Sequence, residues 1–299
     1  MKFFYSDTFD IPLPPKHRFP GSKYSQLRSE LIDQGFLTSD QLIESPLASK
    51  DEIELAHSKD YIEEFFSGEI DLKKMKRIGF PWSEHLVKRI RATMGGAIAA
   101  SEAALNDGLS GQLAGGTHHA HYDYGGGYCI FNDFAISALK LIKDKKVDRV
   151  AIVDLDVHQG DGNASLLKEN KNVFVLSLHG EKNYPFKKFP SDLDVPLPDQ
   201  CGDELYINKL NESLETLEEF KPEFVLFQAG VDVLEHDRLG RLNITYNGLR
   251  KRDEIIFKRF EKKGVPISMA IGGGYSDPIR HSVKAYAQTY EVAKKIYKF

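Results

Sequence analysis

Three side chains of metal-binding type occupy every second position in the middle of the chain. Asp154, Asp156 and His158 follow the apolar run 150–153 within the sequence RVAIVDLDVHQGDG. Because successive side chains of an extended backbone point to opposite sides, alternate residues project to the same side. Two carboxylates and an imidazole that converge at a buried point destabilise one another unless a cation or a tight hydrogen-bond network compensates. The spacing therefore predicts a divalent metal site.

A turn at the end of a strand is the simpler interpretation of these residues. In that case Asp154 and Asp156 cap the following helix, and His158 faces water. A helix cap needs one acceptor rather than three convergent groups, which favours the metal site.

A second stretch combines glycines with adjacent histidines. Residues 112–133 read QLAGGTHHAHYDYGGGYCIFND and place His118 next to His119. Dense glycines let the backbone approach a ligand closely, and neighbouring imidazoles can relay protons near neutral pH. A flexible surface loop is the alternative interpretation.

Alternating strands and helices must position these side chains. We expect strands at 2–5, 150–153, 173–178, from 224 onward, and at 265–271. We expect the main helices at 24–34, 83–106, 134–143, 162–169, 203–220, 247–263 and 278–298, and a short helix after a Ser58 cap. This alternation predicts an α/β fold with an open parallel sheet and helices on both faces. Ligands bind at the carboxyl ends of the strands in such sheets, so Asp232 and Tyr275 join the residues above at one edge.

Two further segments have less specific signals. Lys73, Lys74, Lys76 and Arg77 form a basic patch, which we interpret as a solvated loop. Residues 181–200 contain YPF, FP and VPLP, and so many prolines predict irregular structure. The aromatic residues of this second segment either form the wall of a narrow pocket or pack the loop onto the body.

Length and composition limit the classes of protein. A chain of 299 residues with 41% hydrophobic residues can bury a large core, and we expect a single domain over residues 1–299. The formal net charge of -4, without a long basic run, argues against nucleic-acid binding. Cys129 and Cys201 lack Cys-x-x-Cys spacing, which argues against a thiolate metal site or a disulfide framework. The amino terminus predicts neither a signal peptide nor a membrane span, so we expect a cytoplasmic protein.

The expected edge of the sheet has the ingredients of a metal-assisted hydrolase. Asp156, His158 and Asp232 supply three oxygen and nitrogen ligands and leave positions open, as a catalytic zinc site requires. A zinc ion lowers the pKa of its bound water to roughly 7 and polarises a carbonyl, which suits hydrolysis of an amide or ester. The two adjacent histidines can move protons, and a tyrosine hydroxyl on a glycine turn can donate to an oxyanion.

The motifs GGTHHA, GGGYCIFND, DLDVHQGDG, QAGVDVLEHDRLG and GGGY occur in this order over residues 113–277. In this respect the chain resembles the zinc-dependent histone deacetylase family, which has the arginase/deacetylase fold. The resemblance implies one zinc ion per chain, held by Asp156, His158 and Asp232. It implies that His119 is the general base, that His118 orients water, and that Tyr275 donates to the oxyanion. Asp154 and Asp161 match the carboxylates that buttress His118 and His119.

The resemblance also implies two subsidiary sites. The first is an acyl-lysine channel, lined by Gly127, Tyr128, Gly273 and Gly274. The second is a structural potassium ion, bound largely through backbone carbonyls. Its residues correspond to Asp154, Asp156, His158, Ser177 and Leu178.

Two positions depart from the best-known eukaryotic members. Gln159 replaces a second histidine, and with YPF and SDLDVPLP it resembles the class IV and bacterial deacetylase-like branch. The amino-terminal HRFP and KY segments also resemble bacterial members. Tyr128 replaces a commoner phenylalanine and adds a hydroxyl to the channel wall, so the preferred acyl group stays open.

Three functions are compatible with these residues. The first is removal of acetyl or longer acyl groups from lysine side chains of a protein or peptide, or from a small amine such as an acetylated polyamine. An arginase-like ureohydrolase with two manganese ions would need more bridging aspartates than Asp232 offers. A noncatalytic acyl-lysine or metal-binding module is expected to lack the base or the oxyanion donor, yet His118, His119 and Tyr275 are all present. The oligomeric state is left open.

Overall fold

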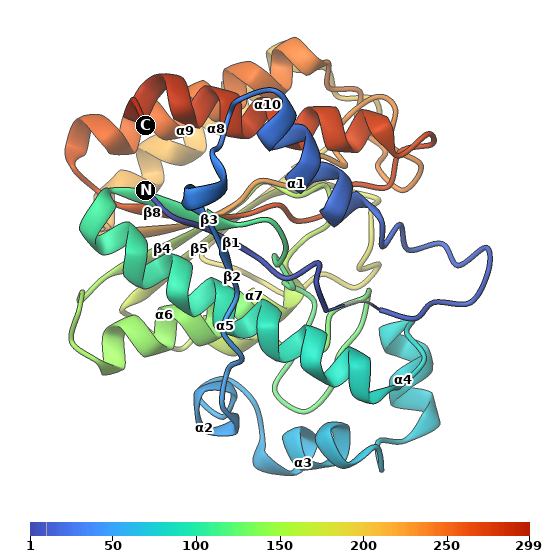
Figure 1. Cartoon of the computed structure of the whole chain (residues 1–299). Coiled ribbons are helices and arrows are strands. Elements are labelled where there is room, and N and C mark those ends of the chain that lie inside the picture. Colours follow the sequence, from blue (N-terminus) through green and yellow to red (C-terminus); the bar gives the residue numbers. More distant parts are fainter. Residues whose placement is uncertain (10) are drawn as a thin grey trace.

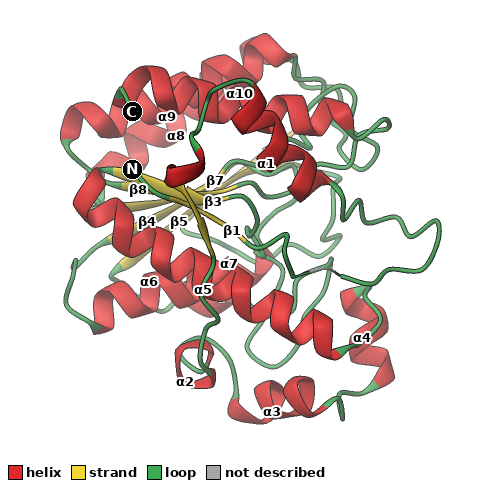
Figure 2. Cartoon of the chain, in the orientation of Figure 1, coloured by secondary structure: helices red, strands yellow, loops and turns green. Residues whose placement is uncertain are grey.

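The computed structural model describes residues 1–9 and 11–299, and its centre is a single sheet of eight parallel strands. The order of the strands is β2-β1-β3-β8-β7-β4-β5-β6. Their bounds are β1 Phe3–Tyr5, β2 Leu42–Glu44, β3 Leu109–Gln112, β4 Val150–Asp154, β5 Val173–Gly180, β6 Leu193–Leu197, β7 Phe224–Gln228 and β8 Ile267–Ala270. Helices lie above and below this sheet (Figures 1 and 2). The predicted fold class is therefore confirmed.

The helices form two layers, each packed on one face of the sheet. One layer contains α1, α8, α9 and α10, and the other contains α5, α6 and α7 (Figure 1). The short helices α2, α3 and α4 extend the second layer. The bounds are α1 Lys23–Asp33, α2 Lys50–Ile53, α3 Lys59–Ser67, α4 Leu72–Ile78, α5 Glu84–Asp107, α6 Asp133–Lys143, α7 Asp161–Leu167, α8 Asp203–Glu219, α9 Tyr246–Lys263 and α10 Arg280–Tyr297. None of the helices in the described residues has the length and apolar character needed to cross a bilayer.

The central strand β4 explains why the site lies where it does. All five residues of β4 are buried, and the strand pairs with β5 on one side and β7 on the other. Its continuous apolar run suits a strand covered by helices on both faces. Residue 154 pairs with Ser177 and Gln228, so the polar residues that follow all three strands meet at one edge of the sheet.

Capping side chains and glycines set the ends of several helices, and the predicted Ser58 cap is confirmed. Ser58 and Ser83 cap α3 and α5, and Asn132 caps α6 through a bond from the Ala135 amide. Gly68 and Gly108 end α3 and α5 in the left-handed conformation. A residue without a β-carbon adopts this conformation at little cost, which explains both stops.

The prediction of a loop at the basic patch is wrong. Residues 72–78 form α4, which Asp71 caps by accepting a 2.6 Å bond from the Lys73 amide and which ends at left-handed Gly79. Few apolar residues mark this helix, and only Met75 and Ile78 are buried. A short helix with two inward residues gives almost no periodic signal.

The prediction of irregular structure throughout 181–200 is also wrong in part, because β6 lies within it. Pro196 is tolerated since β6 is the last strand of the sheet and pairs with β5 alone.

The strands β2 and β3 were not predicted. β3 reads LSGQ, which has no apolar run, and tertiary burial rather than local pattern decides its conformation.

Candidate active site

Three ligand-type side chains converge beyond the carboxyl ends of β4 and β7. Asp156 and His158 follow β4, and Asp232 follows β7. The Nδ1 atom of His158 lies 3.1 Å from Asp156 Oδ1 and 3.0 Å from Asp232 Oδ2. One oxygen or nitrogen of each residue lies within 4.8 Å of the others, and all three residues are buried. Of the three residues that the alternating spacing places together, Asp156 and His158 belong to this cluster. Asp154 bonds to His118 instead, and the second carboxylate of the cluster is Asp232.

The donor set fits a divalent cation. Two buried carboxylates face a single imidazole nitrogen, which carries at most one proton to share between them. Burial raises the pKa of Asp232 to about 7, and Asp156 contributes to the increase. Burial lowers the pKa of His158, but Asp156 and Asp232 outweigh it and raise the value to about 10. The cluster needs positive charge at its centre, and two carboxylates with one imidazole suit zinc.

The simpler turn interpretation does not describe these residues. The residue that precedes α7 is Gly160, and no side chain caps the helix. The carboxylate of Asp154 instead accepts a 2.7 Å bond from His118, and His158 is only 9% exposed.

The adjacent histidines are buried at the same edge, and each is held by its own carboxylate. The Nδ1–H groups of His118 and His119 donate to Asp154 Oδ2 and Asp161 Oδ1, both at 2.7 Å. Burial and the neighbouring His118 lower the pKa of His119 to about 4. His119 is therefore neutral at pH 7, and its unused nitrogen can accept a proton. A flexible loop does not describe this segment.

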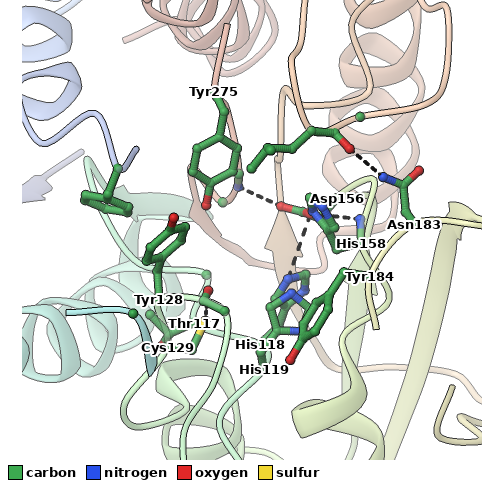
Figure 3. A pocket seen from close by; sticks show the side chains of 18 of the residues that line it. Thr117, His118, His119, Tyr128, Cys129, Asp156, His158, Asn183, Tyr184 and Tyr275 are labelled. Atoms are coloured by element: carbon green, nitrogen blue, oxygen red, sulfur yellow. Dashed lines mark hydrogen bonds and ion pairs between the residues drawn. The ribbon is translucent and has the colours of Figure 1, made fainter. Parts of the chain in front are cut away.

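Tyr275 lies across the cavity from these histidines, on the glycine turn that follows β8 (Figure 3). The Tyr275 amide donates a 2.6 Å bond to Asp237, and the Gly273 amide donates a 2.6 Å bond to Asp156. The turn is therefore tied to a residue of the metal-type cluster. Burial raises the pKa of the Tyr275 hydroxyl well above its ordinary value, and Asp232 adds to the effect. The hydroxyl stays protonated and can donate.

Asp156, His158, the two adjacent histidines and Tyr275 line a cavity of about 880 Å³, whereas Asp232 is not part of its lining. Tyr128 and Phe19 form one wall, with their rings 5.1 Å apart. Tyr184 forms the opposite wall, with its ring 4.9 Å from the ring of His119 (Figure 3). The residues 181–200 thus contribute Tyr184 and Phe186 to the pocket, as one of the two sequence interpretations predicts.

Glycine is required at two of the predicted channel positions. A β-carbon at Gly127, whose φ is 54°, would lie 2.7 Å from His119. A β-carbon at Gly273 would lie 1.9 Å from the Asp232 carboxylate. Both residues line the cavity, whereas Gly274 does not, and a β-carbon there would meet the Tyr286 hydroxyl at 2.2 Å. Gly272 takes its place in the lining.

Ser177 and Leu178 are fully buried in β5 beside the end of β4. Ser177 pairs with Asp154 in the sheet, and the potassium site itself stays a prediction. The two cysteines take no part in a disulfide, and both are buried.

Sequence reasoning missed Lys23 as a residue of the site. Its buried ammonium lies 3.4 Å from the carbonyls of Gly272 and Gly274 and 5.0 Å from the ring centre of Tyr275. Burial lowers the pKa of Lys23 to about 8. The available signal was the KY pair, which resembles bacterial members but reveals nothing about the glycine turn.

The role of Gln159 was also missed. Its side chain amide donates to Phe189 O at 2.7 Å and to Asp194 at 2.6 Å, and its oxygen accepts from the Phe189 amide. Gln159 therefore attaches the loop that carries Tyr184 to the segment with the metal-type residues.

Fold and site together define an α/β protein with a candidate metal centre at the carboxyl edge of a parallel sheet. The model of the histone deacetylase domain matches residues 17–290. Histone deacetylase 2 of Arabidopsis thaliana is 30% identical, over 96% of this chain and 77% of that protein. An uncharacterised protein of Picosynechococcus sp. is 38% identical, over 98% of each chain. The chain belongs to the histone deacetylase family.

Solved structures agree with this assignment. The crystal structure of an HDAC homologue complexed with SAHA has 25% identity and a TM-score of 0.84, over 100% of this chain and 88% of that one. An acetylpolyamine aminohydrolase from Burkholderia pseudomallei has 18% identity and a TM-score of 0.82, over 99% of each chain, which shows the shared fold. Family membership supports amide deacetylation as the activity.

Proposed function

We propose that this protein is a zinc-dependent amide hydrolase that removes acetyl or longer acyl groups from lysine side chains. The observation that carries the proposal is the convergence of Asp156, His158 and Asp232 at the base of a cavity, between two His–Asp pairs and Tyr275. Zinc held by these three residues would polarise the amide carbonyl as a Lewis acid and would lower the pKa of water.

The remaining chemistry belongs to side chains of the chain. His119 is neutral, and Asp161 fixes its Nδ1–H, so its other nitrogen accepts a proton from water and later protonates the leaving amine. His118, held by Asp154, orients the water. Tyr275 donates a hydrogen bond to the oxyanion that forms on the substrate carbonyl. Each of these effects is typically worth about a hundredfold or more.

The walls of the cavity suit an extended acylated side chain. Tyr128, Phe19 and Tyr184 present aromatic surface along its length, and Gly127 keeps the space beside His119 free. We keep deacetylation of a small amine as the alternative, because the fold is shared with an acetylpolyamine aminohydrolase. A two-metal ureohydrolase is disfavoured, because a single ligand cluster was found among the described residues.

Three further expectations complete the proposal. The carbonyls of Asp154, Asp156, His158, Ser177 and Leu178 would hold a structural potassium ion. Residues 1–299 would form one catalytic domain. The protein would act in the cytoplasm.

The test is metal analysis combined with a substrate panel. Purified protein should contain about one zinc ion per chain and should hydrolyse acetyl-lysine or long-chain acyl-lysine peptides. A chelator should abolish this activity, and added zinc should restore it. Asp156→Asn should lose both metal and activity, whereas Asp148→Asn at an exposed position should retain both. Full activity in chelated protein, or faster hydrolysis of acetylated polyamines than of any peptide, would contradict the proposal.

A further inference from the structure

The mouth of the cavity is surrounded by exposed cationic side chains. Three segments that are distant in sequence contribute them: the end of α4, the loop after β5 and the loop after β7. The residues are Lys76, Arg77, Lys182, Arg238 and Arg241. Among the described residues that line the cavity, only Asp156, at its base, carries a carboxylate. This mouth is basic although the whole chain has a formal net charge of -4.

Neighbouring carboxylates neutralise this charge only in part. Arg241 and Lys182 share Asp199, and Lys182 is 3.7 Å from it. Arg238 lies 3.7 Å from Asp277 in a pair that is half exposed or more on both sides. Exposed pairs of this kind contribute little binding energy and leave the cation accessible to a competing anion.

The side of the mouth formed by α4 has no such compensation. Arg77 lies over the ring of Tyr124 at 3.9 Å, which fixes a cation without neutralising it. In the described part of the chain, Lys76 and Arg77 form no ion pair. The nearby Lys74, in contrast, pairs with Glu64. The mouth therefore keeps an excess of accessible positive charge, concentrated on α4.

Apolar side chains lie among these cations. Phe186 is 90% exposed and Leu239 is 40% exposed, and both line the cavity. A mouth that combines cations with exposed apolar groups suits a peptide of mixed acidic and apolar residues better than a phosphate backbone. The ring of charge also surrounds a pit, whereas a nucleic-acid surface usually extends along a groove or stripe.

We infer, on the basis of the proposed function, that the preferred substrate is an acyl-lysine within an acidic protein segment. Acylation removes the positive charge of the lysine itself, so the residues on either side of it determine the charge presented to the mouth. Carboxylates at these positions would meet Lys76 and Arg77. An acetylated polyamine keeps further ammonium groups, which would lie among like charges at the same place.

The preference should act on encounter and binding rather than on the bond-breaking step. Charges that surround a cleft increase the local concentration of an oppositely charged ligand and the rate of association. Exposed charges are screened over about 8 Å at physiological salt. We therefore expect the effect in KM and kcat/KM, with kcat nearly constant, and we expect it to weaken as salt increases.

The experiment uses the full-length, zinc-loaded enzyme and three acetyl-lysine peptides of one length. Glu, Ala or Lys occupies the two positions on either side of the acetyl-lysine. At low salt, kcat/KM should be about tenfold or more higher for the Glu peptide than for the Lys peptide, in line with electrostatic steering. Most of the difference should disappear at about 0.5 M salt. Acetylated spermidine should be a worse substrate than the Ala peptide.

Charge reversal locates the effect on the surface. The double variant Lys76→Glu, Arg77→Glu should reverse the order of kcat/KM for the Glu and Lys peptides. Lys171→Glu is the matched control, because Lys171 is exposed just before β5 begins, at the opposite edge of the sheet. This control should keep the wild-type order. A circular dichroism spectrum of each variant checks that it is folded.

Failure of this inference is distinguishable from failure of the proposed function. Equal turnover of the three peptides would overturn the inference and leave the hydrolase intact. Faster turnover of a succinyl-lysine peptide with Ala at the flanking positions than of the Glu peptide would place the recognised charge on the carboxylate of the acyl group and overturn it too. If no peptide is hydrolysed, the proposed function fails, and fluorescence anisotropy of the labelled peptides still tests whether the mouth binds acidic sequences more tightly than basic ones.

Discussion

At the scale of single residues, His119 shows how neighbouring groups prepare a side chain for chemistry. Asp161 accepts its Nδ1–H, Gly127 leaves room for its ring, and Tyr184 packs against it. Burial keeps its pKa near 4, so the imidazole remains a neutral proton acceptor over the physiological range. The free nitrogen is therefore fixed in both position and protonation state.

The hydroxyl of Tyr275 provides the sharpest test at this scale. Tyr275→Phe removes the proposed oxyanion donor and little else, because the recorded polar contacts of this residue are made by its backbone. We expect kcat to fall by about a hundredfold or more, with KM changed little. Steady-state kinetics on an acyl-lysine peptide measures both values. A Phe variant with full turnover would contradict the assigned role.

At the scale of elements, the site depends on loops that a few buried polar residues connect. Gln159 joins the segment after β4 to the loop that precedes β6. His57 joins the loop before α3 to the segment with the adjacent histidines: it pairs with the His121 carbonyl at 2.8 Å and accepts from the Asn132 amide at 2.8 Å. Both residues act on the cavity without contacting it.

The connection made by Gln159 predicts a combined loss of stability and activity. Gln159→Met keeps the approximate size and removes three hydrogen bonds, each worth about 1 kcal/mol. We expect the free energy of unfolding in urea to fall by about 3 kcal/mol, and kcat/KM to fall because Tyr184 is held less firmly. The exposed Gln34→Met is the control. If both variants behave alike, Gln159 does not hold the loop.

The buried His57 predicts a specific dependence of stability on pH. Burial lowers its pKa from 6.5 to about 4, so the unfolded chain takes up a proton first as the pH falls. The contribution of His57 is complete above pH 6.5 and declines toward pH 4, by about 2 kcal/mol between pH 7.5 and 5. The free energies of unfolding of wild type and His57→Gln, both measured in urea, should therefore approach each other by about 2 kcal/mol between pH 7.5 and pH 5. A constant difference would contradict the prediction, and the exposed His85→Gln serves as control.

At the scale of the whole molecule, the sheet order brings together groups that lie far apart in sequence. β7 and β8 lie next to β4 and β3 in the sheet, so the residues after these strands converge at one edge. Two helical layers with separate apolar clusters cover the sheet and leave this edge open. The ligand cluster therefore exists only when the fold is complete, and binding of a cation at the cluster must stabilise the fold.

This linkage is measurable as a change in melting temperature. Zinc at about a thousand times its dissociation constant should stabilise the folded state by about 4 kcal/mol, which corresponds to about 6 °C for a chain of 299 residues. Removal of zinc by a chelator should reverse the change. Asp232→Asn removes a ligand but keeps an oxygen that accepts from the Val157 amide. Its melting temperature should therefore be close to that of the metal-free wild type and should not change when zinc is added. An equal zinc response in this variant would contradict the assigned cluster.

The sequence by itself determined the central strand, most of the long helices and the residues of the cluster. A continuous apolar run followed by Asp154, Asp156 and His158 is a local signal, because both burial and alternation are properties of neighbouring residues. The caps Ser58, Ser83 and Asn132 are local for the same reason. Asp232 and Tyr275 could be assigned to the same edge because parallel strands share their carboxyl ends.

Tertiary structure alone decided the short elements and the surroundings of the site. The three-residue strand β2, the LSGQ strand β3 and the Pro-containing β6 have conformations fixed by their neighbours in the sheet. Lys23 reaches the glycine turn across about 250 positions of sequence, and α4 brings its cations to the mouth of the cavity. Such contacts depend on how layers pack, and no local pattern of residues encodes that packing.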